Sequence, residues 1–583
     1  MDNLLSKINH PKELRTFEAS QLTALAHEMR EFILDTLSVK PGHLGASLGV
    51  IELTIALHYH FNTPKDLLIW DVGHQCYPHK ILTGRQQIFD SLRQKDGISG
   101  FPTRIESEFD TFGTGHSSTS ISAIVGMATA DKINQINRKH IAIIGDASIT
   151  SGMSLEALNH LGSTDLDVLV ILNDNDIGID PSVGGLKKHF KSLENQSENL
   201  FSNFGLNFIG TIDGHNFDEL LNAFNKADSI KGPKVLHIKT TKGKGYEQAE
   251  IDQVKWHAPG LFDKETGEIK SKKKEKSYQD VFGETMHQLL EDNSQIVAIT
   301  PAMLTGSNLV KCHQDFPERV LDVGIAEQHA VTFAAGLATQ NTIPYCVIYS
   351  TFLQRAYDQV IHDVALQNLP VVFCIDRAGF VGTDGATHHG YFDIAYLREI
   401  PNMIVSSPRN EKDFKNLLYT AQFTTQPFAI RYPKNNIQTS NFKVKKIEIG
   451  QSEIIFEGNQ LAILSTGLIS SRIEEIIIQN HLQDKVALID FPFIKPLDES
   501  RLKAISLKYS TILTFEDGIK KGGFGSGILE FLNSIHYKGN ITINGYPDEF
   551  IEHASISELE QMVGLDDSSI LEMLFSYLKI QQS

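Results

Sequence analysis

The sequence predicts an α/β protein built from three domains with parallel sheets. Short apolar runs end abruptly in Gly, Asp, Asn or Ser and are followed by stretches with helical periodicity. Such alternation of strand and helix is typical of parallel sheets covered by helices. We expect strands within His140–Asp146, Leu166–Asn175, Pro344–Ser350, Pro370–Gly379 and Thr511–Gly518.

The domain boundaries follow from chain length and from two polar stretches. A chain of 583 residues exceeds what one hydrophobic core usually serves. Residues Lys264–Lys276 are highly charged, with Ile269 as their only large apolar residue, and precede a new helical start at Tyr278. A second polar stretch, Pro433–Lys446, precedes another α/β pattern. We therefore expect domains at residues 1–277, 278–440 and 441–583.

The composition excludes several classes of function. Lys and Arg number 53 against 71 Asp and Glu, which gives a net charge of −18 and disfavours nucleic acid as a partner. No stretch approaches ~18 uninterrupted apolar residues, and we expect neither a membrane protein nor a signal peptide. The cysteines lack CxxC spacing, which disfavours a disulfide framework or a zinc ribbon. A cytoplasmic location follows as the expectation.

Polar residues follow two of the expected strands at positions suited to a cation. The carboxyl ends of parallel strands meet at one edge of a sheet, where ligands of open α/β folds bind. Asp146 and Asn175 lie at two such ends, and the backbone carbonyl of Ile177 follows. Oxygen ligands of this kind suit Mg²⁺ together with diphosphate oxygens. The amides of Ala147 and Ser148, which open a helix, would face the diphosphate.

This arrangement resembles the thiamine-diphosphate motif of transketolase-like enzymes, and longer motifs narrow the resemblance. They are similar to those of the 1-deoxy-D-xylulose-5-phosphate synthase family and occur in that family's order along nearly the whole chain. The motifs are Trp70–Gln75, Gly115–Ser120, Asp322–His329, Tyr349–Tyr357, Asp376–Gly379, Asp384–His388 and Pro547–His553.

The resemblance implies a fold, cofactors and a reaction. The first domain would bind diphosphate and Mg²⁺, the second the pyrimidine of thiamine diphosphate, and the third would be a C-terminal transketolase-like α/β domain. The cofactor site would lie between the first two domains of a homodimer. The implied reaction decarboxylates pyruvate and joins the remainder to D-glyceraldehyde 3-phosphate, which gives 1-deoxy-D-xylulose 5-phosphate and CO₂ for isoprenoid and thiamine precursors.

The resemblance also implies roles for individual residues. Glu327 would lie against N1′ of the aminopyrimidine, where a buried carboxyl has the raised pKa that proton transfer needs. The other positions expected to line the cofactor are His74, Gly115, His116, Ser117, Ala147, Ser148, Asn175, Tyr246 and Phe352. The polar positions expected around the reacting carbon are His43, His257, His388 and Asp384. The substrate-binding positions are Tyr349, Arg355, Arg377 and Arg431, with Arg377 and Arg431 expected on phosphate.

One departure and two alternatives accompany this interpretation. The family usually has Gly-Asp-Gly-Ala where this chain has Gly145–Ser148, and Ala147 adds a Cβ beside the expected diphosphate. One alternative is a transketolase that moves a ketol unit between sugar phosphates, which would release no CO₂ from pyruvate. The other is a catalytically silent regulatory paralogue, which the intact Glu327, Asp146 and Asn175 disfavour.

Two glycine-containing segments resemble nucleotide motifs but lack a required residue. Gly522–Gly527 has Ile528 or Glu530 where a dinucleotide fingerprint needs its third glycine. Gly243-Lys244 has Ile238 where a P-loop needs its first glycine. We expect a tight turn in the third domain at the first of these segments and no nucleotide site at either.

Overall fold

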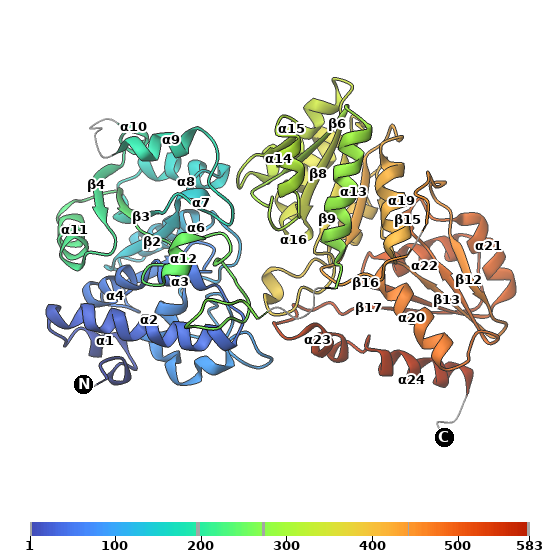
Figure 1. Ribbon diagram of the computed structural model, residues 1–583, viewed down its shortest axis with the longest axis horizontal. Coiled ribbons are helices and arrows are strands. Elements are labelled where there is room, and N and C mark those ends of the chain that lie inside the picture. Colours follow the sequence, from blue (N-terminus) through green and yellow to red (C-terminus); the bar gives the residue numbers. More distant parts are fainter. Residues whose placement is uncertain (1–2, 194–198, 271–274, 441, 580–583) are drawn as a thin grey trace. The chain divides into compact units, whose positions relative to one another are not determined.

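The computed structural model describes residues 3–193, 199–270, 275–440 and 442–579 (Figure 1). The chain divides into two compact units, one formed by Met1–Lys273 with Gly324–Ala326 and the other by Lys274–Val323 with Glu327–Ser583. The division after residue 273 falls in the stretch expected to be a linker, of which residues 271–274 lie outside the described residues. The three exact domain ranges remain predictions.

The first unit contains a five-stranded parallel sheet in the order β1-β2-β3-β5-β4. Its strands are β1 (Leu67–Trp70), β2 (His140–Gly145), β3 (Val168–Asp174), β4 (Asn207–Asp213) and β5 (Lys234–Lys239). The central strands β2 and β3 are buried almost throughout, because helices cover both faces of the sheet. Both strands expected in this region from the sequence are confirmed.

The helices of the first unit form two layers. Apolar residues of α6 and α8 pack on one face of the sheet, and those of α4 and α11 pack on the other. The helices are α1 (Pro11–Leu14), α2 (Leu22–Val39), α3 (Leu44–Leu48), α4 (Ile51–His60), α5 (Tyr77–Lys80), α6 (Ser120–Ile133), α7 (Asp146–Ile149), α8 (Gly152–Gly162), α9 (Gly185–Ser192), α10 (Leu200–Asn203), α11 (Phe217–Ser229) and α12 (Glu247–Ile251).

The second unit begins with a seven-stranded sheet in the order β15-β10-β11-β9-β8-β6-β7. Its strands are β6 (Ile296–Thr300), β7 (Val320–Asp322), β8 (Ile343–Tyr349), β9 (Val372–Asp376), β10 (Ile404–Ser406), β11 (Phe428–Tyr432) and β15 (Phe493–Lys495). Only β15 runs antiparallel among the described strands of this sheet. This edge strand comes from beyond residue 440, so the segment expected to form the third domain also completes the second sheet.

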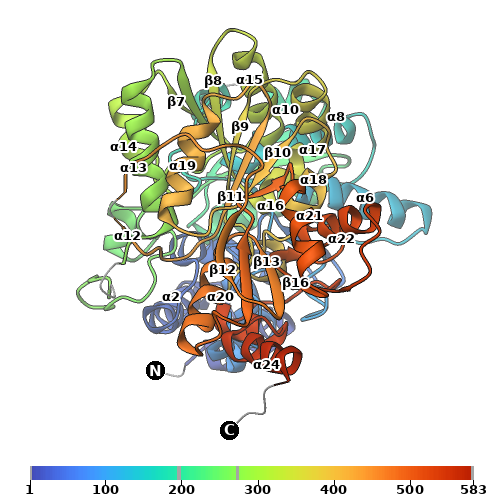
Figure 2. The same ribbon diagram turned by 90° about the vertical axis from the view of Figure 1, so that its right-hand side faces the viewer.

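Helices cover this sheet. Ser277 caps α13 by a capping box with Asp280, and α13 lies beside α19 in both views (Figures 1 and 2). The helices are α13 (Tyr278–Asp292), α14 (Val310–Asp315), α15 (Glu327–Ala338), α16 (Ser350–Leu353), α17 (Tyr357–Gln359), α18 (Asp393–Arg398) and α19 (Glu411–Ala421).

A five-stranded sheet in the order β12-β14-β13-β16-β17 completes the second unit. Its strands are β12 (Glu453–Glu457), β13 (Leu461–Ser465), β14 (Val486–Asp490), β16 (Thr511–Ile519) and β17 (Asn540–Tyr546), with β12 antiparallel to β14. Its helices are α20 (Leu468–Gln479), α21 (Glu499–Lys508), α22 (Phe524–Ser534), α23 (Ile556–Met562) and α24 (Asp567–Leu578). The predicted α/β class with mainly parallel sheets is confirmed.

The glycine-rich segment before α22 forms the expected turn. The Glu516 carboxylate accepts hydrogen bonds from the amides of Phe524 at 2.7 Å and Gly525 at 2.9 Å. The beginning of α22 is therefore occupied by a carboxylate of the chain itself, because these amides are the groups that an anion would otherwise bind.

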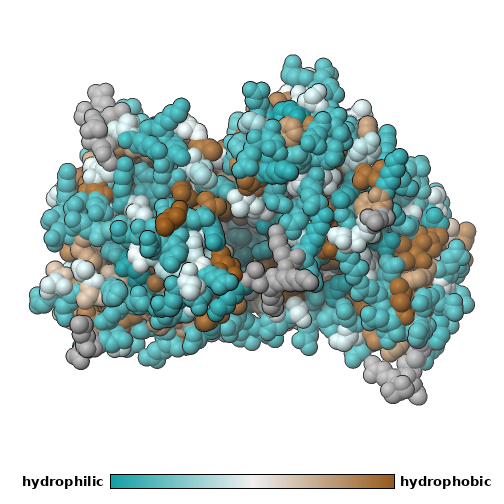
Figure 3. Space-filling model, viewed as in Figure 1, coloured by the Kyte–Doolittle hydropathy of each residue, from teal (hydrophilic) through white to brown (hydrophobic). Residues whose placement is uncertain are grey.

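The surface is rich in polar side chains. The face shown in Figure 3 is mainly hydrophilic, with apolar side chains gathered in small groups. Among the described residues, no helix has the length and apolar character needed to cross a membrane.

Candidate functional site

The predicted metal-binding residues gather at the carboxyl edge of the first sheet. Helix α7 follows β2 directly, and β3 lies beside β2, so Asp146 and Asn175 emerge from neighbouring strands. The backbone N–H of Asn175 donates to the Asp146 carboxylate, which also accepts from Ser182 Oγ at 2.9 Å. The amide of Ile177 donates to Asn175 Oδ1 at 3.3 Å. Burial, together with the nearby charge of Asp174, raises the pKa of Asp146 to about 6.

This setting suits a cation. A buried carboxylate that loses solvation and faces another carboxylate is stabilised in its charged form when a metal ion binds. Ala147 and Ser148 lie in α7, which has only four residues, so their amides rather than a long helix dipole would attract a diphosphate. The residues present therefore fit a magnesium–diphosphate group.

Lys242 also lies at this edge of the sheet, although no role for it was expected from the sequence. It follows β5, and its Nζ donates to the carbonyl oxygen of Gly178 at 2.6 Å. Burial lowers the pKa of Lys242 to about 8, and the charges of Asp146 and Asp180 oppose that shift. Its position just after a strand of the same sheet could have identified Lys242 as a candidate site residue from the sequence, because ligands bind at that edge.

A second loop is fixed to the first by Asp71. The Asp71 carboxylate accepts from the amides of Ser118 at 2.7 Å and Ser120 at 3.1 Å. Ser118 has a φ of 71° and donates through Oγ to the carbonyl of Ser148 at 2.8 Å. The predicted cofactor residues Gly115–Ser117 directly precede this turn. Asp71 was part of a recognised motif, but its role as an anchor depends on pairing between distant segments.

Three predicted histidines form a cluster. The ring centroids are 5.8 Å apart for His43 and His74, 5.3 Å for His43 and His257, and 5.5 Å for His74 and His257. Burial lowers the pKa of His74 to about 3 and the pKa of His257 well below its ordinary value. Nδ1 of each of these two rings is buried without a hydrogen-bond partner among the described residues. Such neutral nitrogens are suited to a bound polar group.

Arg93 orients one ring of this cluster. Its Nη2 lies 2.9 Å from Nδ1 of His43. Because a guanidinium only donates, Nδ1 accepts and the proton of the neutral His43 ring lies on Nε2. Tyr246 is also buried, and its hydroxyl donates to the carbonyl of Lys264 at 3.2 Å.

In the second unit, Glu327 begins α15 and is 4% exposed. Its Oε2 has no hydrogen-bond partner among the described residues. Burial raises the pKa of Glu327, and the charge of Arg355, whose Nη1 lies 3.9 Å from Oε2, opposes that shift. A buried carboxyl with an unused oxygen fits the ring nitrogen of an aminopyrimidine.

Further predicted residues of the second unit lie together. Tyr349 and Phe352 stack with centroids 5.5 Å apart, and the His388 ring meets Phe352 edge-on at 5.8 Å. Arg377 Cζ lies 4.1 Å from the Tyr349 ring centroid. Asp384 precedes the short helix Gly385–Thr387, which leads directly to His388.

Arg377 opens onto a polar cavity at the carboxyl ends of β6, β9 and β11. The cavity has a volume of about 530 Å³ and is also lined by Asn308, Lys434 and Asn435. Arg377 Nη1 donates to the carbonyl of Gly306 at 2.9 Å and pairs with Asp376. The cavity is large enough for a small phosphorylated molecule.

Arg431 has a different setting, which does not support its predicted role on phosphate. It is 1% exposed, and Nε lies 3.1 Å from both Asp393 carboxylate oxygens. Nη1 lies 2.5 Å from Asp517 Oδ1, and Nη2 donates to the Asp517 carbonyl at 3.0 Å. All three nitrogens therefore hold groups of the chain itself. Arg431 thus forms a buried ion pair with Asp393 and Asp517, and its expected contact with phosphate remains a prediction.

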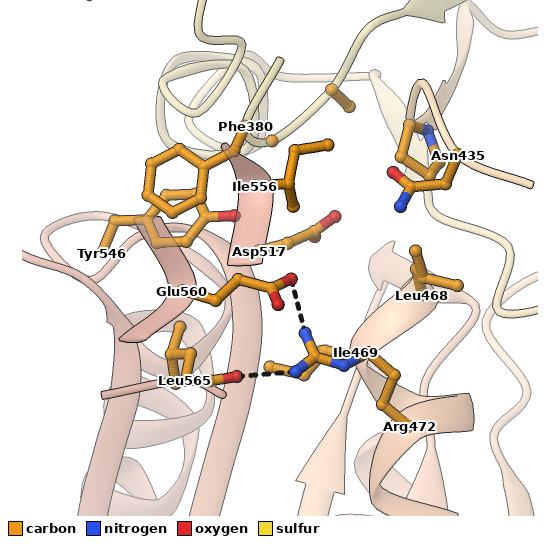
Figure 4. A pocket seen from close by; sticks show the side chains of 13 residues that line it. Phe380, Asn435, Leu468, Ile469, Arg472, Asp517, Tyr546, Ile556, Glu560 and Leu565 are labelled. Atoms are coloured by element: carbon orange, nitrogen blue, oxygen red, sulfur yellow. Dashed lines mark hydrogen bonds and ion pairs between the residues drawn. The ribbon is translucent and has the colours of Figure 1, made fainter. Parts of the chain in front are cut away.

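The neighbourhood of Asp517 also offers little space. Figure 4 shows the cavity that Asp517 lines together with Arg472 and Glu560. Its volume is about 30 Å³, room for roughly one or two water molecules. Arg472 closes one side through Glu560 at 2.6 Å and the Leu565 carbonyl at 3.0 Å. No substrate of the expected size fits here.

We expect Arg431→Met to destabilise the protein. The change leaves Asp393 and Asp517 without their cation, and breaking a buried pair in this way costs about 3–5 kcal/mol. Thermal denaturation measures the loss. Lys521→Met is the control, since it removes a cation from an exposed pair with Asp548, which is worth about 0–1 kcal/mol. Normal stability with a raised KM for glyceraldehyde 3-phosphate would instead support the expected contact of Arg431 with phosphate.

Comparisons with known proteins agree with this geometry. Residues 5–199 and 192–240 match the family model described as 1-deoxy-D-xylulose-5-phosphate synthase. The 1-deoxy-D-xylulose-5-phosphate synthase of Cytophaga hutchinsonii is 48% identical, covering 97% of this chain and 97% of its own. The chain belongs to the 1-deoxy-D-xylulose-5-phosphate synthase family. The same enzyme of Parabacteroides distasonis is 45% identical over 98% of this chain and 99% of its own.

The remaining domains of this synthase family member match transketolase models. Residues 274–439 match the transketolase pyrimidine binding domain and residues 450–570 the transketolase C-terminal domain. A solved transketolase from Campylobacter jejuni covers 96% of this chain and 100% of its own, with 19% identity and a TM-score of 0.45. Enzymes of the synthase family are thiamine-diphosphate-dependent transferases, so the predicted family, fold, enzyme class and cofactor are confirmed.

Proposed function

We propose that this chain decarboxylates pyruvate and joins the two-carbon remainder to D-glyceraldehyde 3-phosphate, which yields 1-deoxy-D-xylulose 5-phosphate and CO₂. The observation that carries the proposal is the buried Glu327 carboxyl, whose Oε2 accepts no hydrogen bond from the described residues. The family resemblance implies that Glu327 is the residue that contacts N1′ of the aminopyrimidine. A transketolase activity is disfavoured because the N-terminal residues match the synthase model.

The two groups of residues divide the work of holding the cofactor. Asp146, Asn175 and the Ile177 carbonyl would bind Mg²⁺, which the family resemblance places with the diphosphate. Thiamine diphosphate, when bound, supplies the electron sink for decarboxylation. The residues that would line it are His74, Gly115, His116, Ser117, Ala147, Ser148, Tyr246, Glu327 and Phe352.

Proton transfer is assigned to polar residues expected around the reacting carbon. The neutral His43 ring carries its proton on Nε2, because Arg93 occupies Nδ1. We assign His43, His257, His388 and Asp384 to proton transfers around the reacting carbon, which contribute typically 10²–10⁴-fold. Arg355, next to Glu327, is assigned to the part of the substrate derived from pyruvate.

Recognition of the acceptor phosphate is assigned to Arg377 with Tyr349. A phosphate dianion gains little from the overall field of a protein with net charge −18, so short charge-assisted contacts must supply the affinity. Arg377 keeps its position through Asp376 and Gly306 and lines the polar cavity. The cavity would receive the phosphate end of glyceraldehyde 3-phosphate.

We expect Arg377→Met to raise the KM for glyceraldehyde 3-phosphate by roughly 10- to 100-fold. The lost contacts are worth about 1.5–3 kcal/mol each, and ~1.4 kcal/mol is a tenfold change. The KM for pyruvate should change by less than about 3-fold, since pyruvate carries no phosphate. Steady-state kinetics measure both constants.

Arg377→Lys is the matched control for this prediction. Lysine keeps a cation beside Asp376 but loses the planar fork, so it should give an intermediate KM and normal thermal stability. Unphosphorylated D-glyceraldehyde should be used equally well by parent and variants. A larger effect on pyruvate than on glyceraldehyde 3-phosphate would assign Arg377 to the donor instead.

One assay tests the overall reaction. The full-length protein with thiamine diphosphate and Mg²⁺ is given carboxyl-labelled pyruvate, with and without glyceraldehyde 3-phosphate. We expect labelled CO₂ and 1-deoxy-D-xylulose 5-phosphate in equal amounts when both substrates are present. Absence of CO₂ release, with ketol transfer between sugar phosphates, would establish the transketolase alternative.

We further propose a homodimer in the cytoplasm that supplies isoprenoid and thiamine precursors. Exposed apolar side chains such as Leu366, which is 72% exposed, are of the kind that a partner subunit covers. The four cysteines are free and buried, as suits a reducing compartment. Light scattering on the purified protein tests the dimer directly.

A further inference from the structure

A buried network of Arg30, Glu52 and His215, here called the His215 network, contacts the backbone that follows β5. Glu52 of α4 accepts from Arg30 Nη2 of α2 at 2.6 Å and lies 2.9 Å from His215 Nδ1. On the other side of the ring, the amide of Thr241 donates to His215 Nε2 at 2.8 Å. His215 lies in the turn between β4 and α11, so four separate parts of the first unit meet here.

The hydrogen bonds fix the protonation of His215. A backbone N–H can only donate, so Nε2 must accept and the ring proton must lie on Nδ1. That proton is donated to Glu52. Burial acts to raise the pKa of Glu52, but the hydrogen bond from His215 and the charge of Arg30 outweigh it and lower that pKa, so Glu52 is ionised. The neutral ring links a carboxylate to a backbone amide.

Close packing leaves the segment Thr241–Tyr246 little freedom. Arg30 Nε donates to the carbonyl of Lys244 at 2.8 Å, and the amide of Gly243 donates to the carbonyl of Gly45 at 2.8 Å. A Cβ at Gly245 would lie 2.4 Å from Arg30 Cδ. The segment is therefore held on both sides by the chain.

This segment carries Lys242 to the edge of the sheet. Lys242 Nζ donates to the Gly178 carbonyl at 2.6 Å, just beyond the proposed metal ligand Ile177. A Cβ at Gly45 would lie 3.3 Å from Lys242 Cγ, so the stem of the lysine is also confined. The Thr241 amide, which donates to His215, belongs to the residue directly before this lysine.

We propose that His215 is a positioning residue of the cofactor site, which holds the Thr241 amide and thereby sets Lys242 against the magnesium loop, with Glu52 and Arg30 as its anchor. The proposal rests on the proposed function, because it concerns the same cofactor. The arrangement parallels metal sites in which a carboxylate orients a histidine that in turn orients the group beyond it.

Two substitutions separate the contact of His215 with Thr241 from its contact with Glu52. The amide of Gln reaches the position of ring Nε2, so His215→Gln keeps an acceptor for the Thr241 amide. The amide of Asn reaches the position of Nδ1, so His215→Asn keeps the donor to Glu52 and loses Thr241. A role limited to the hydrogen bond with Glu52 would favour Asn, whereas the proposed role, which depends on the Thr241 amide, favours Gln.

Two measurements on the full-length protein test the proposal. Calorimetry gives the affinity for thiamine diphosphate in Mg²⁺, and hydrogen exchange of residues 240–246 is followed in the cofactor-free protein. We expect His215→Asn to weaken cofactor binding by roughly 10- to 100-fold, the usual cost of mutating a residue that orients a metal ligand. The same change should speed hydrogen exchange of the segment. His215→Gln should stay within about 3-fold of the parent, which corresponds to less than ~0.7 kcal/mol.

The exposed His160 provides the control, and His160→Asn should match the parent in both measurements. Parent-like affinity and exchange in His215→Asn would overturn the proposal. Equal losses in the Asn and Gln variants, with equal losses of thermal stability, would also overturn it by assigning His215 to packing alone. If the parent protein bound no thiamine diphosphate, the proposed function would be wrong. Unchanged hydrogen exchange in His215→Asn would separately show that His215 does not hold the segment Thr241–Tyr246.

Discussion

Replacement of Glu327 with Gln is expected to lower kcat by roughly 10²–10⁴ while leaving the fold and cofactor binding in place. Glutamine has nearly the same volume and can still form a hydrogen bond to the aminopyrimidine, but it cannot exchange a proton. The buried setting supports this expectation, because burial raises the pKa of Glu327 and its Oε2 accepts no hydrogen bond within the described part of the chain. Single-turnover release of CO₂ from pyruvate is the direct measurement.

The control for this variant is an exposed carboxylate of the same unit. Glu318→Gln should retain parent activity, because its side chain lies at the surface. Calorimetry with thiamine diphosphate should give similar affinities for the parent and both variants. A kcat for Glu327→Gln within a few-fold of the parent would refute the assigned proton transfer. A loss of cofactor binding alone would show that Glu327 holds the cofactor without acting on it.

The fold could be predicted where strands are locally encoded. The run IAII before Gly145 and the run VLVIL before Asn173 are apolar on both faces, which is typical of central parallel strands. Once both are strands, their adjacency places Asp146 and Asn175 at one edge. Strand β15 was not predicted, because three residues are too few to show hydrophobic periodicity and because its partner β10 lies far away in sequence.

The setting of Arg431 could not be read from its local sequence. The family resemblance implies a phosphate-binding position for Arg431, but its partner Asp517 lies 86 residues away on another sheet. The same limit applies to Lys242 and Asp71, whose contacts join separate loops. Such pairings depend on how the sheets and helices pack. A motif indicates which type of residue is present but not which residue it contacts.

The largest effect on cofactor binding is expected from Asp146→Ala combined with Asn175→Ala. Few protein ligands hold Mg²⁺ at such sites, so losing two of them should weaken magnesium-dependent binding of thiamine diphosphate by more than about 100-fold. The cofactor-free protein should not be destabilised by loss of the carboxylate. Burial and the charge of Asp174 raise the pKa of Asp146 to about 6, so its ionised form at neutral pH costs folding stability.

A loss of cofactor binding without a loss of stability in the cofactor-free protein distinguishes a metal ligand from a structural residue. Without cofactor, the double variant should have the melting temperature of the parent in thermal denaturation. Addition of thiamine diphosphate and Mg²⁺ should raise the melting temperature of the parent but not that of the double variant. Asp165→Ala, which removes an exposed carboxylate paired with Lys132, should gain stability from the cofactor as the parent does. Equal thiamine diphosphate affinity of parent and double variant, with and without a chelator, would place the metal site elsewhere in the chain.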